Sequence, residues 1–155
     1  MRKPCAVIIC SAVLAASAFI AALPTSAWCA GPDWVLLDQN PGSRFYYDQS
    51  DAKKPATGVV QVRTRVIYTD EGKADALKIL EDAQKFARLS ESRYVYDLDC
   101  KKEQSRLLEV RHLDEEGVTL KTTDLKSATE WEEVSPDGRL GLVQEKVCAP
   151  ATTKK

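Results

Sequence analysis

The chain of 155 residues contains a single histidine, His112, and no Cys-x-x-Cys pair. A zinc site of the usual kind needs several Cys or His ligands, and a thioredoxin-like centre or a covalently attached haem needs two closely spaced cysteines. Nucleophile motifs such as Gly-x-Ser-x-Gly are missing as well. These absences argue against the common metal, redox and hydrolase centres, so we expect neither a cofactor nor a catalytic residue.

The chain also lacks an excess of charge of either sign. It carries 22 Lys and Arg against 23 Asp and Glu, a formal net charge of −1, and the two signs are interspersed. Proteins that bind nucleic acid or an anionic membrane surface through a general field carry a basic excess. The balance therefore predicts no nucleic-acid partner and no electrostatic attachment to membranes.

The side chains that could carry chemistry have simpler interpretations. We interpret His112, on a predicted hairpin strand, as a structural or surface residue rather than a catalytic base. Asp97 and Asp99 share one face of a predicted strand, a spacing that can bind a divalent cation. Because Arg93 lies on the same face, a solvated, salt-bridged strand is the better interpretation. We therefore predict that the protein is not an enzyme.

The strongest local feature is an export leader. Two basic residues precede an apolar run of about 18 residues, residues 6–23, which a proline and several small residues follow. This order is typical of a secretory signal peptide over residues 1–29, cleaved after either Ala27 or Cys29. The run is also close to the shortest membrane span, so an uncleaved anchor is the alternative. With the leader removed, we expect no stable membrane insertion.

The remaining cysteines predict one covalent link. Cys5 and Cys10 leave with the leader and Cys29 lies at its boundary, so the domain keeps Cys100 and Cys148. In an exported protein such a pair predicts a structural disulfide. In the loop-entropy treatment, closing a loop of roughly 49 residues would stabilise the fold by about 4 kcal/mol.

Residues 30–148 have the length of one domain, and apolar and polar residues alternate through most of it. Alternation predicts six strands, over residues 34–37, 44–47, 59–68, 93–100, 106–113 and 118–124. In the third of these, valines occupy one face while Arg63 and Arg65 occupy the other, a pattern typical of a strand with one wet side. Residues 51–58 are predicted to form a loop.

Two helices complete the predicted fold. Apolar residues recur three and four apart between residues 73 and 88, which is typical of an amphipathic helix. Ser135–Pro136 predicts the start of a C-terminal helix that ends at Cys148. The fold class is therefore α+β: a mostly antiparallel sheet of about six strands, one inserted helix, and a C-terminal helix tied on by the disulfide. We expect the small, polar tail, residues 149–155, to be disordered.

Three residues are candidate contacts for a protein partner. Arg63 and Arg65 form a basic stripe on a strand, and Trp131 lies between glutamates. Arginine and tryptophan are common anchors of protein interfaces. An exposed strand face and a core tryptophan are the plainer interpretations of the same residues.

Several short motifs, in this order, resemble the surface-adhesin protein E family of Gram-negative bacteria. They are Trp34, Tyr46-Tyr47-Asp48, the strand from Val60 to Tyr68, Leu98-Asp99-Cys100, Trp131-Glu132-Glu133-Val134-x-Pro136 and Val147-Cys148. The resemblance covers residues 33–148. It implies a six-stranded antiparallel sheet with a disulfide-tied C-terminal helix in an exported, non-catalytic domain. Adhesins of the family bind host matrix proteins such as vitronectin and laminin, so a matrix or envelope protein is the implied partner.

The final location and the assembly stay open at this point. Lipid anchoring would need a small residue directly before a cysteine of the leader, but Ile9 precedes Cys10 and Trp28 precedes Cys29. The exported protein is therefore expected in the periplasm or at the cell surface. A periplasmic carrier with a small-ligand pocket between sheet and helices is the alternative function, and a homodimer through an exposed sheet edge is compatible with the pattern.

Overall fold

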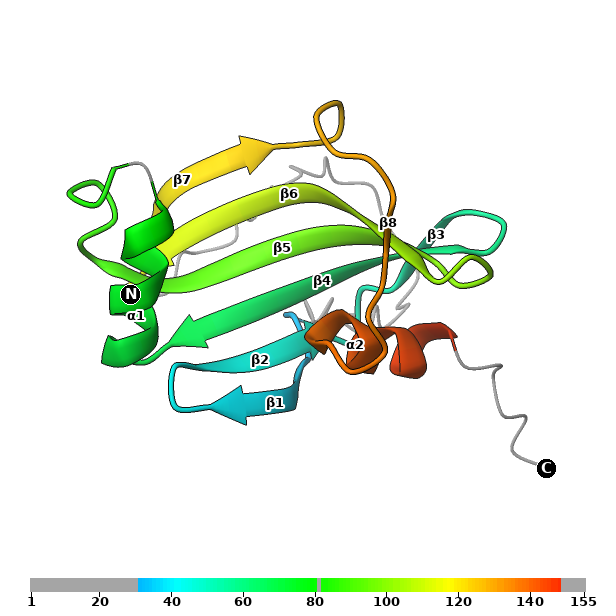
Figure 1. Ribbon diagram of the computed structural model, residues 1–155, viewed down its shortest axis with the longest axis horizontal. Helices are drawn as coiled ribbons and strands as arrows, with labels where there is room; N and C mark the ends of the chain where they lie inside the picture. The colour runs from blue at the N-terminus through cyan, green and yellow to red at the C-terminus, as the bar shows by residue number, and fades with distance from the viewer. Residues whose placement is uncertain (1–30, 81, 149–155) are drawn as a thin grey trace, which may run out of the picture. The chain divides into compact units, whose positions relative to one another are not determined.

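The computed structural model describes residues 31–80 and 82–148, which all belong to the unit Gly31–Lys155. The described residues form one antiparallel sheet and two helices (Figure 1), which confirms the predicted α+β fold class. The predicted leader over residues 1–29 and the predicted disordered tail over residues 149–155 lie outside the described residues.

Six strands follow one another across the sheet in the order β1, β2, β4, β5, β6 and β7, and each neighbouring pair is antiparallel. All six strands predicted from alternation are present, with slightly different ends. Their bounds are β1 Trp34–Asn40, β2 Ser43–Asp48, β4 Val59–Tyr68, β5 Leu89–Asp99, β6 Gln104–Asp114 and β7 Thr119–Asp124.

Two short strands extend this sheet. Strand β3, Lys53–Ala56, pairs with the first part of β4, whereas β2 pairs with its second part. The edge of β6 is divided in a similar way. Strand β8, Glu132–Glu133, pairs with the first residues of β6, and β7 pairs with its later residues. The predicted loop over residues 51–58 is therefore wrong in its centre. Pairing with β4 holds the segment extended despite Pro55, which an edge strand tolerates.

Helix α1, Asp70–Ile79, is anchored at its first turn. The Thr69 hydroxyl accepts a hydrogen bond from the N–H of Gly72 at 3.2 Å and donates one to the carbonyl of Pro41 at 2.7 Å. Gly72 lies so close to the turn between β1 and β2 that a Cβ atom on it would come within 1.8 Å of the Gly42 oxygen. Thr69 therefore caps the helix and also fixes it to the first hairpin.

The predicted helix over residues 73–88 is wrong at both ends, because α1 starts earlier and stops at Ile79. No residue of α1 is buried, and Ile79 is 84% exposed, so the apolar residues spaced three and four apart do not form a buried helix face. Phe86 is instead only 3% exposed and packs edge-on against His112, with ring centroids 5.0 Å apart. Residues 83–88 therefore form turns rather than a helix, because Phe86 is held against His112 of β6.

Helix α2, Arg139–Cys148, lies against one face of the sheet and closes the core (Figure 1). Its ion pair with β1, between Arg139 and Asp38, spans 2.7 Å. The predicted disulfide between Cys100 and Cys148 is confirmed and joins the end of α2 to the end of β5. Val143 of α2 is fully buried among side chains from β2, β4 and β5, namely Phe45, Tyr47, Val60, Val62, Val66 and Leu98.

The predicted start of the C-terminal helix at Ser135–Pro136 is wrong, because a short turn comes first and α2 begins at Arg139. The carbonyl of Ser135 accepts a hydrogen bond from the N–H of Gly138 at 3.0 Å, so these residues form a turn ahead of α2. Gly141 packs directly against this turn, and a Cβ atom on it would lie 2.3 Å from the Pro136 oxygen. The turn therefore packs beside the helix instead of forming its first residues.

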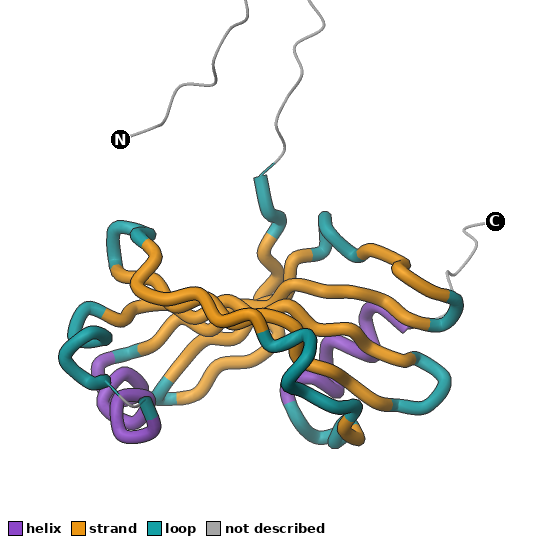
Figure 2. Tube along the Cα trace, turned by 90° about the horizontal axis from the view of Figure 1, so that it is seen from above, coloured by secondary structure: helices purple, strands orange, loops and turns teal. Residues whose placement is uncertain are grey.

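The two helices serve separate parts of the sheet. Figure 2 shows a strongly twisted sheet with α1 and α2 at opposite ends of its strands. Such twist is the usual consequence of strand geometry. Neither helix of the described chain is both long and apolar enough to cross a membrane.

The close approach of α1 to the first hairpin predicts that one glycine-to-alanine substitution in this helix destabilises the protein, which is the opposite of the usual effect. Replacing glycine by alanine inside an exposed helix normally stabilises a protein by up to about 1 kcal/mol. We expect Gly72→Ala to lower the free energy of unfolding by about 1–3 kcal/mol, because the new methyl group would push against Gly42. Urea denaturation measures the change. Ala74→Gly on the same helix is the control for intrinsic propensity, and a stabilising Gly72→Ala would contradict the contact.

The disulfide predicts a loss of stability on removal. We expect the double variant Cys100→Ser and Cys148→Ser to lose about 4 kcal/mol of unfolding free energy, since the unfolded chain is no longer constrained. Urea denaturation measures the loss, and hydrogen exchange should show faster exchange of the α2 amides. The reduced wild-type protein is the matched control. An unchanged unfolding midpoint in both proteins would show that the bond does not hold α2 on the sheet.

Candidate functional site

The face of the sheet opposite α2 carries arginines on its three central strands. Along β4, the alternating residues Val62, Thr64 and Val66 are buried, so the side chains between them point to the other face. Strand pairing continues the same alternation onto β5 and β6. We call this surface the arginine face; it comprises Arg63, Arg65, Arg93, Arg106 and Arg111, with the aromatic residues Trp34, Tyr46 and Trp131 in contact with them.

Three of these arginines are direct neighbours across the sheet. The register pairs Arg65 with Arg93, and Arg93 with Arg111. Like charges directly opposite each other on paired strands are destabilising. Glu91 forms ion pairs with Arg93 and, at 4.0 Å, with Arg65, while Glu109 pairs with Arg111 at 2.9 Å. Three cations thus share two carboxylates in this row, so part of its positive charge is not compensated.

Aromatic rings hold the first part of this row in place. The guanidinium carbon of Arg65 lies 4.7 Å from the ring centroid of Trp34 and 4.5 Å from that of Tyr46. Arg93 lies 5.9 Å from the centroid of the same Trp34. Such cation–π contacts are favourable, and they leave the Arg65 side chain 21% exposed. Arg65 is therefore both accessible and ordered.

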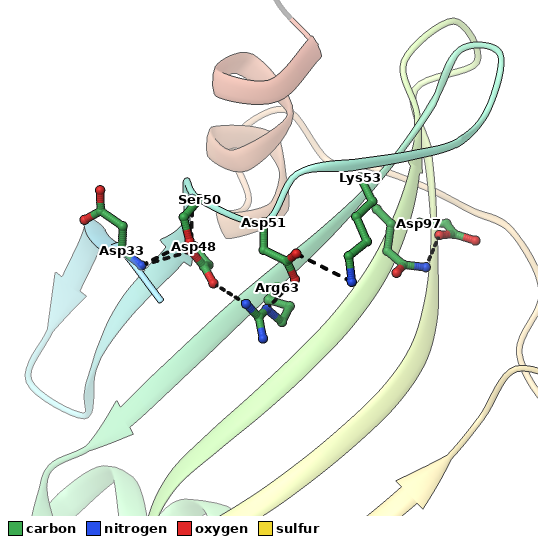
Figure 3. A network of polar contacts seen from close by, with 8 residues as sticks. Asp33, Asp48, Ser50, Asp51, Lys53, Arg63 and Asp97 are labelled. Carbon is green, nitrogen blue, oxygen red and sulfur yellow. Dashed lines mark hydrogen bonds and ion pairs between the residues drawn. The ribbon is translucent and has the colours of Figure 1, made fainter. Parts of the chain in front are cut away.

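Arg63, in contrast, belongs to a network of polar contacts that uses its charge (Figure 3). Its Nη2 donates to Asp48 Oδ2 at 2.7 Å, and its Nε lies 2.8 Å from Asp51 Oδ2. Asp48 is fully buried and also accepts from the Ser50 hydroxyl at 2.6 Å and from the N–H of Asp33 at 3.1 Å. Burial alone would raise the pKa of Asp48, but the hydrogen bonds and the charge of Arg63 outweigh it and hold the pKa below its usual value. Arg63 thus ties the connection after β2 to β4.

Trp131 reaches another part of the arginine face through Arg106. The Arg106 guanidinium lies 5.1 Å from the centroid of the half-buried Trp131 ring and pairs with Asp97 at 3.0 Å. Asp97 also accepts a hydrogen bond from the Gln61 amide at 3.1 Å. The structure therefore places all three predicted contacts on one face but gives them different surroundings. Arg65 lies in the arginine row, Arg63 in a structural network, and Trp131 beside Arg106.

The predicted pair of strand aspartates is split between two roles. Asp97 is salt-bridged as predicted, but it is only 6% exposed, so the prediction of a solvated position is wrong. Asp99 accepts hydrogen bonds from the backbone N–H groups of Lys101 and Lys102 at 3.0 and 3.1 Å in the turn after β5. Across residues 31–80 and 82–148, no three His, Cys, Asp or Glu side chains gather into a possible metal site.

A small cleft opens in the arginine face. Its volume is about 90 Å³, and its lining includes Trp34, Arg63, Arg93, Glu109 and Arg111. Pockets for small molecules usually measure about 300–1,000 Å³. The cleft therefore suits a single side chain of a protein partner better than a separate small molecule.

A larger groove lies on the opposite face of the sheet, beside the segment that follows α1. Its volume is about 570 Å³, within the usual range of small-molecule sites. The apolar lining consists of Ile79, Leu80, Phe86, Val110 and Leu125, and the polar lining of Asp82, Lys85, His112, Lys121 and Thr123.

His112 lines this groove with one ring nitrogen already bonded. Its Nδ1 lies 2.8 Å from the hydroxyl of Ser92, which accepts a hydrogen bond from the hydroxyl of Tyr68 at 3.1 Å. The Ser92 hydroxyl can donate to Nδ1 or accept from it, and when it donates, the single proton of a neutral imidazole lies on Nε2. Burial and, after it, the charge of Lys121 lower the pKa of His112, so the ring is neutral at pH 7.

The sequence pattern did not reveal several of these residues. Arg93 and Arg111 alternate in the expected way along their strands, but nothing local to either strand shows that they are paired with each other. The contact between Ser92 and His112 likewise depends on the register of β5 and β6. A pairing of strands inferred from co-varying positions is the signal that could have found both.

The chain belongs to the surface-adhesin protein E family. The model of that family matches residues 34–149, which is most of the chain and confirms the resemblance seen in the motifs. Its members are described as surface adhesins, so the family is one of binding proteins exported to the cell surface.

Solved structures similar to this chain include two of protein E from Haemophilus influenzae. Crystal form II of that protein is 17% identical, with a TM-score of 0.48 over 77% of this chain and 97% of that one. A second structure of it is 16% identical, with a TM-score of 0.47 over 77% of this chain and 91% of that one. No curated protein sequence matches the chain.

The lowered pKa of His112 predicts a pH dependence of stability. An unfolded histidine titrates near about pH 6.5. Because the folded pKa is lower, the unfolded chain binds more protons, so stability is complete above about pH 6.5 and falls as the pH drops towards the folded pKa. Urea denaturation at several pH values between about 7.5 and 5 measures this, and His112→Gln should flatten the profile. A wild-type profile as flat as that of the variant would contradict the lowered pKa.

Proposed function

We propose that the protein is exported and binds an extracellular or envelope protein through the arginine face. The observation that carries this proposal is the row of Arg65, Arg93 and Arg111, aligned across three strands and stacked in part on Trp34. Membership of a surface-adhesin family supports binding, rather than catalysis, as the work of the domain.

The composition of the arginine face favours a protein partner. Arginine, tryptophan and tyrosine are the residue types that dominate the energetics of protein interfaces. Carboxylates lie among the arginines, so the surface is mixed in charge rather than uniformly basic. A mixed surface fits a partner that offers acidic and apolar groups together, whereas a polyanion would meet the carboxylates as well.

The three candidate contacts have different parts in this proposal. Arg65 acts directly, together with Arg93, because both are ordered by Trp34 and share the carboxylate of Glu91 with each other. Arg63 positions the surface through its ion pairs with the buried Asp48 and the half-buried Asp51. Trp131 extends the surface past Arg106 and contributes a secondary contact.

Export and partner identity complete the proposal. We assign residues 1–29 to a signal peptide and residues 30–148 to the binding domain, with the periplasm or the cell surface as its location. The matrix proteins vitronectin and laminin are the first partners to test, because the family resemblance implies them. Envelope proteins are the second group.

We expect Arg65→Gln and Arg93→Gln to weaken binding to the partner by about 5–30-fold each, as is usual for interface arginines. Biolayer interferometry with immobilised vitronectin, laminin and a panel of purified envelope proteins measures the affinity. Lys78→Gln is the matched control, because it removes the same charge from α1, where Lys78 pairs with Asp75. Circular dichroism verifies that each variant is folded.

Two results would count against the proposal. A complete absence of saturable binding across the panel would remove protein binding as the function. Binding that Arg65→Gln and Arg93→Gln leave unchanged would show that a different surface meets the partner. For Arg63→Gln we expect lower stability to accompany any loss of binding, since the buried Asp48 would lose its ion pair.

The second candidate function is the binding of a small ligand, as in a periplasmic carrier. The groove of about 570 Å³ beside α1 supports it, because a closed surface on this side of the sheet would leave no room for a ligand. This function uses the face opposite the arginine face, so the two functions are physically compatible.

A further inference from the structure

We propose that the groove beside α1 binds a carboxylate attached to a short hydrocarbon chain. This inference rests on the second proposed function, small-ligand binding, and names the class of ligand and the residues that recognise it. It follows from three properties of the groove: an exposed apolar wall, two lysines that form no ion pair with another described residue, and a histidine whose Nδ1 is already hydrogen-bonded.

The apolar wall accounts for the hydrocarbon part of the ligand. Ile79 is 84% exposed although it is a large hydrophobic residue, and it borders the same groove as Leu80, Val110 and Leu125. Exposed apolar groups that gather in a concave site commonly mark a binding surface. A short hydrocarbon chain along this wall would remove these side chains from water.

The lysines of the groove account for the negative charge of the ligand. Lysine ion pairs among the described residues involve Lys53, Lys78 and Lys126. Lys85 and Lys121 therefore have no ion-pair partner within residues 31–80 and 82–148, although both line the groove. Asp82 is the acidic residue among the described lining residues, and its Oδ1 accepts the backbone N–H of Lys85.

His112 offers a ring nitrogen beside one of these lysines. It is paired directly with Lys121 across β6 and β7. Its Nδ1 is hydrogen-bonded to Ser92, so Nε2 is the ring nitrogen left for a ligand, and it carries the proton when the Ser92 hydroxyl donates to Nδ1. An ammonium group and a neutral N–H donor side by side are complementary to the two oxygens of a carboxylate, which only accepts hydrogen bonds.

Two other hollows lined by described residues lack this combination. The groove of about 390 Å³ beside the disulfide is lined by Glu103 and Glu145 and by no basic residue among those that the structure describes, so these glutamates would repel a carboxylate. The cleft of the arginine face, at about 90 Å³, is too small for a separate ligand of this kind. The groove beside α1 is thus the one of the three that suits an apolar anion.

Octanoate is the probe that tests the proposal, and octanamide, which has the same chain without the charge, is its matched control. Isothermal titration calorimetry at pH 7 measures both affinities on the folded domain. NMR of the His112 ring gives an independent signal, which is unambiguous because the chain contains one histidine. We expect saturable binding of octanoate, a shift of the His112 ring resonances, and binding of octanamide weaker by about tenfold or more.

Single substitutions assign the binding to the groove. Lys121→Gln should weaken the binding of octanoate by about tenfold and leave the binding of octanamide unchanged, because only the charged carboxylate pairs with the ammonium group. Ile79→Ser should weaken both probes. Lys53→Gln, which removes the same charge from β3 at a distance from the groove, should change neither.

The outcomes separate the two levels of the proposal. If octanoate and octanamide bind equally, the groove binds small ligands but the assignment of a carboxylate is wrong. If neither binds and the His112 resonances stay in place, both the ligand class and the small-ligand function are wrong. Octanoate binding that survives both Lys121→Gln and Ile79→Ser would place the ligand elsewhere and overturn the assignment to this groove.

Discussion

The register of β4, β5 and β6 is the constraint on which the rest of the structure depends. It pairs Val60 with Leu98, so that both reach the core under α2, and by the same alternation it pairs Arg65 with Arg93 on the opposite face. A slip of one residue would reverse the direction of every side chain on the strand. The buried valines therefore enforce the alignment of the arginines, although the arginines repel one another.

An irregularity in this register gives the arginine face its width. The pairing of β5 with β6 shifts between Val95 and Tyr96, so that β6 contributes one extra residue at that point. Because of this shift, Arg106 and Arg111 share a face although an odd number of positions separates them, and Arg106 comes into contact with Trp131. β-Bulges commonly re-aim side chains in this way.

The two faces of the sheet are covered by different structural elements. On one face the disulfide and the buried Val143 hold α2 over the core, while beside α1 a groove lined by His112 stays open. On the other face, arginine and aromatic side chains cover the strands through cation–π contacts and ion pairs. The domain can therefore present a protein-binding surface and a ligand groove on one scaffold.

The sequence by itself determined the six long strands, the disulfide between Cys100 and Cys148, and the outward direction of Arg63 and Arg65, because alternation and export signals are properties of neighbouring residues. Tertiary structure alone decided that Phe86 packs on His112 instead of ending a long helix, and that Arg93 and Arg111 join Arg65 in one row. These features depend on contacts between residues far apart in the chain, and no local pattern encodes which strand positions will face each other.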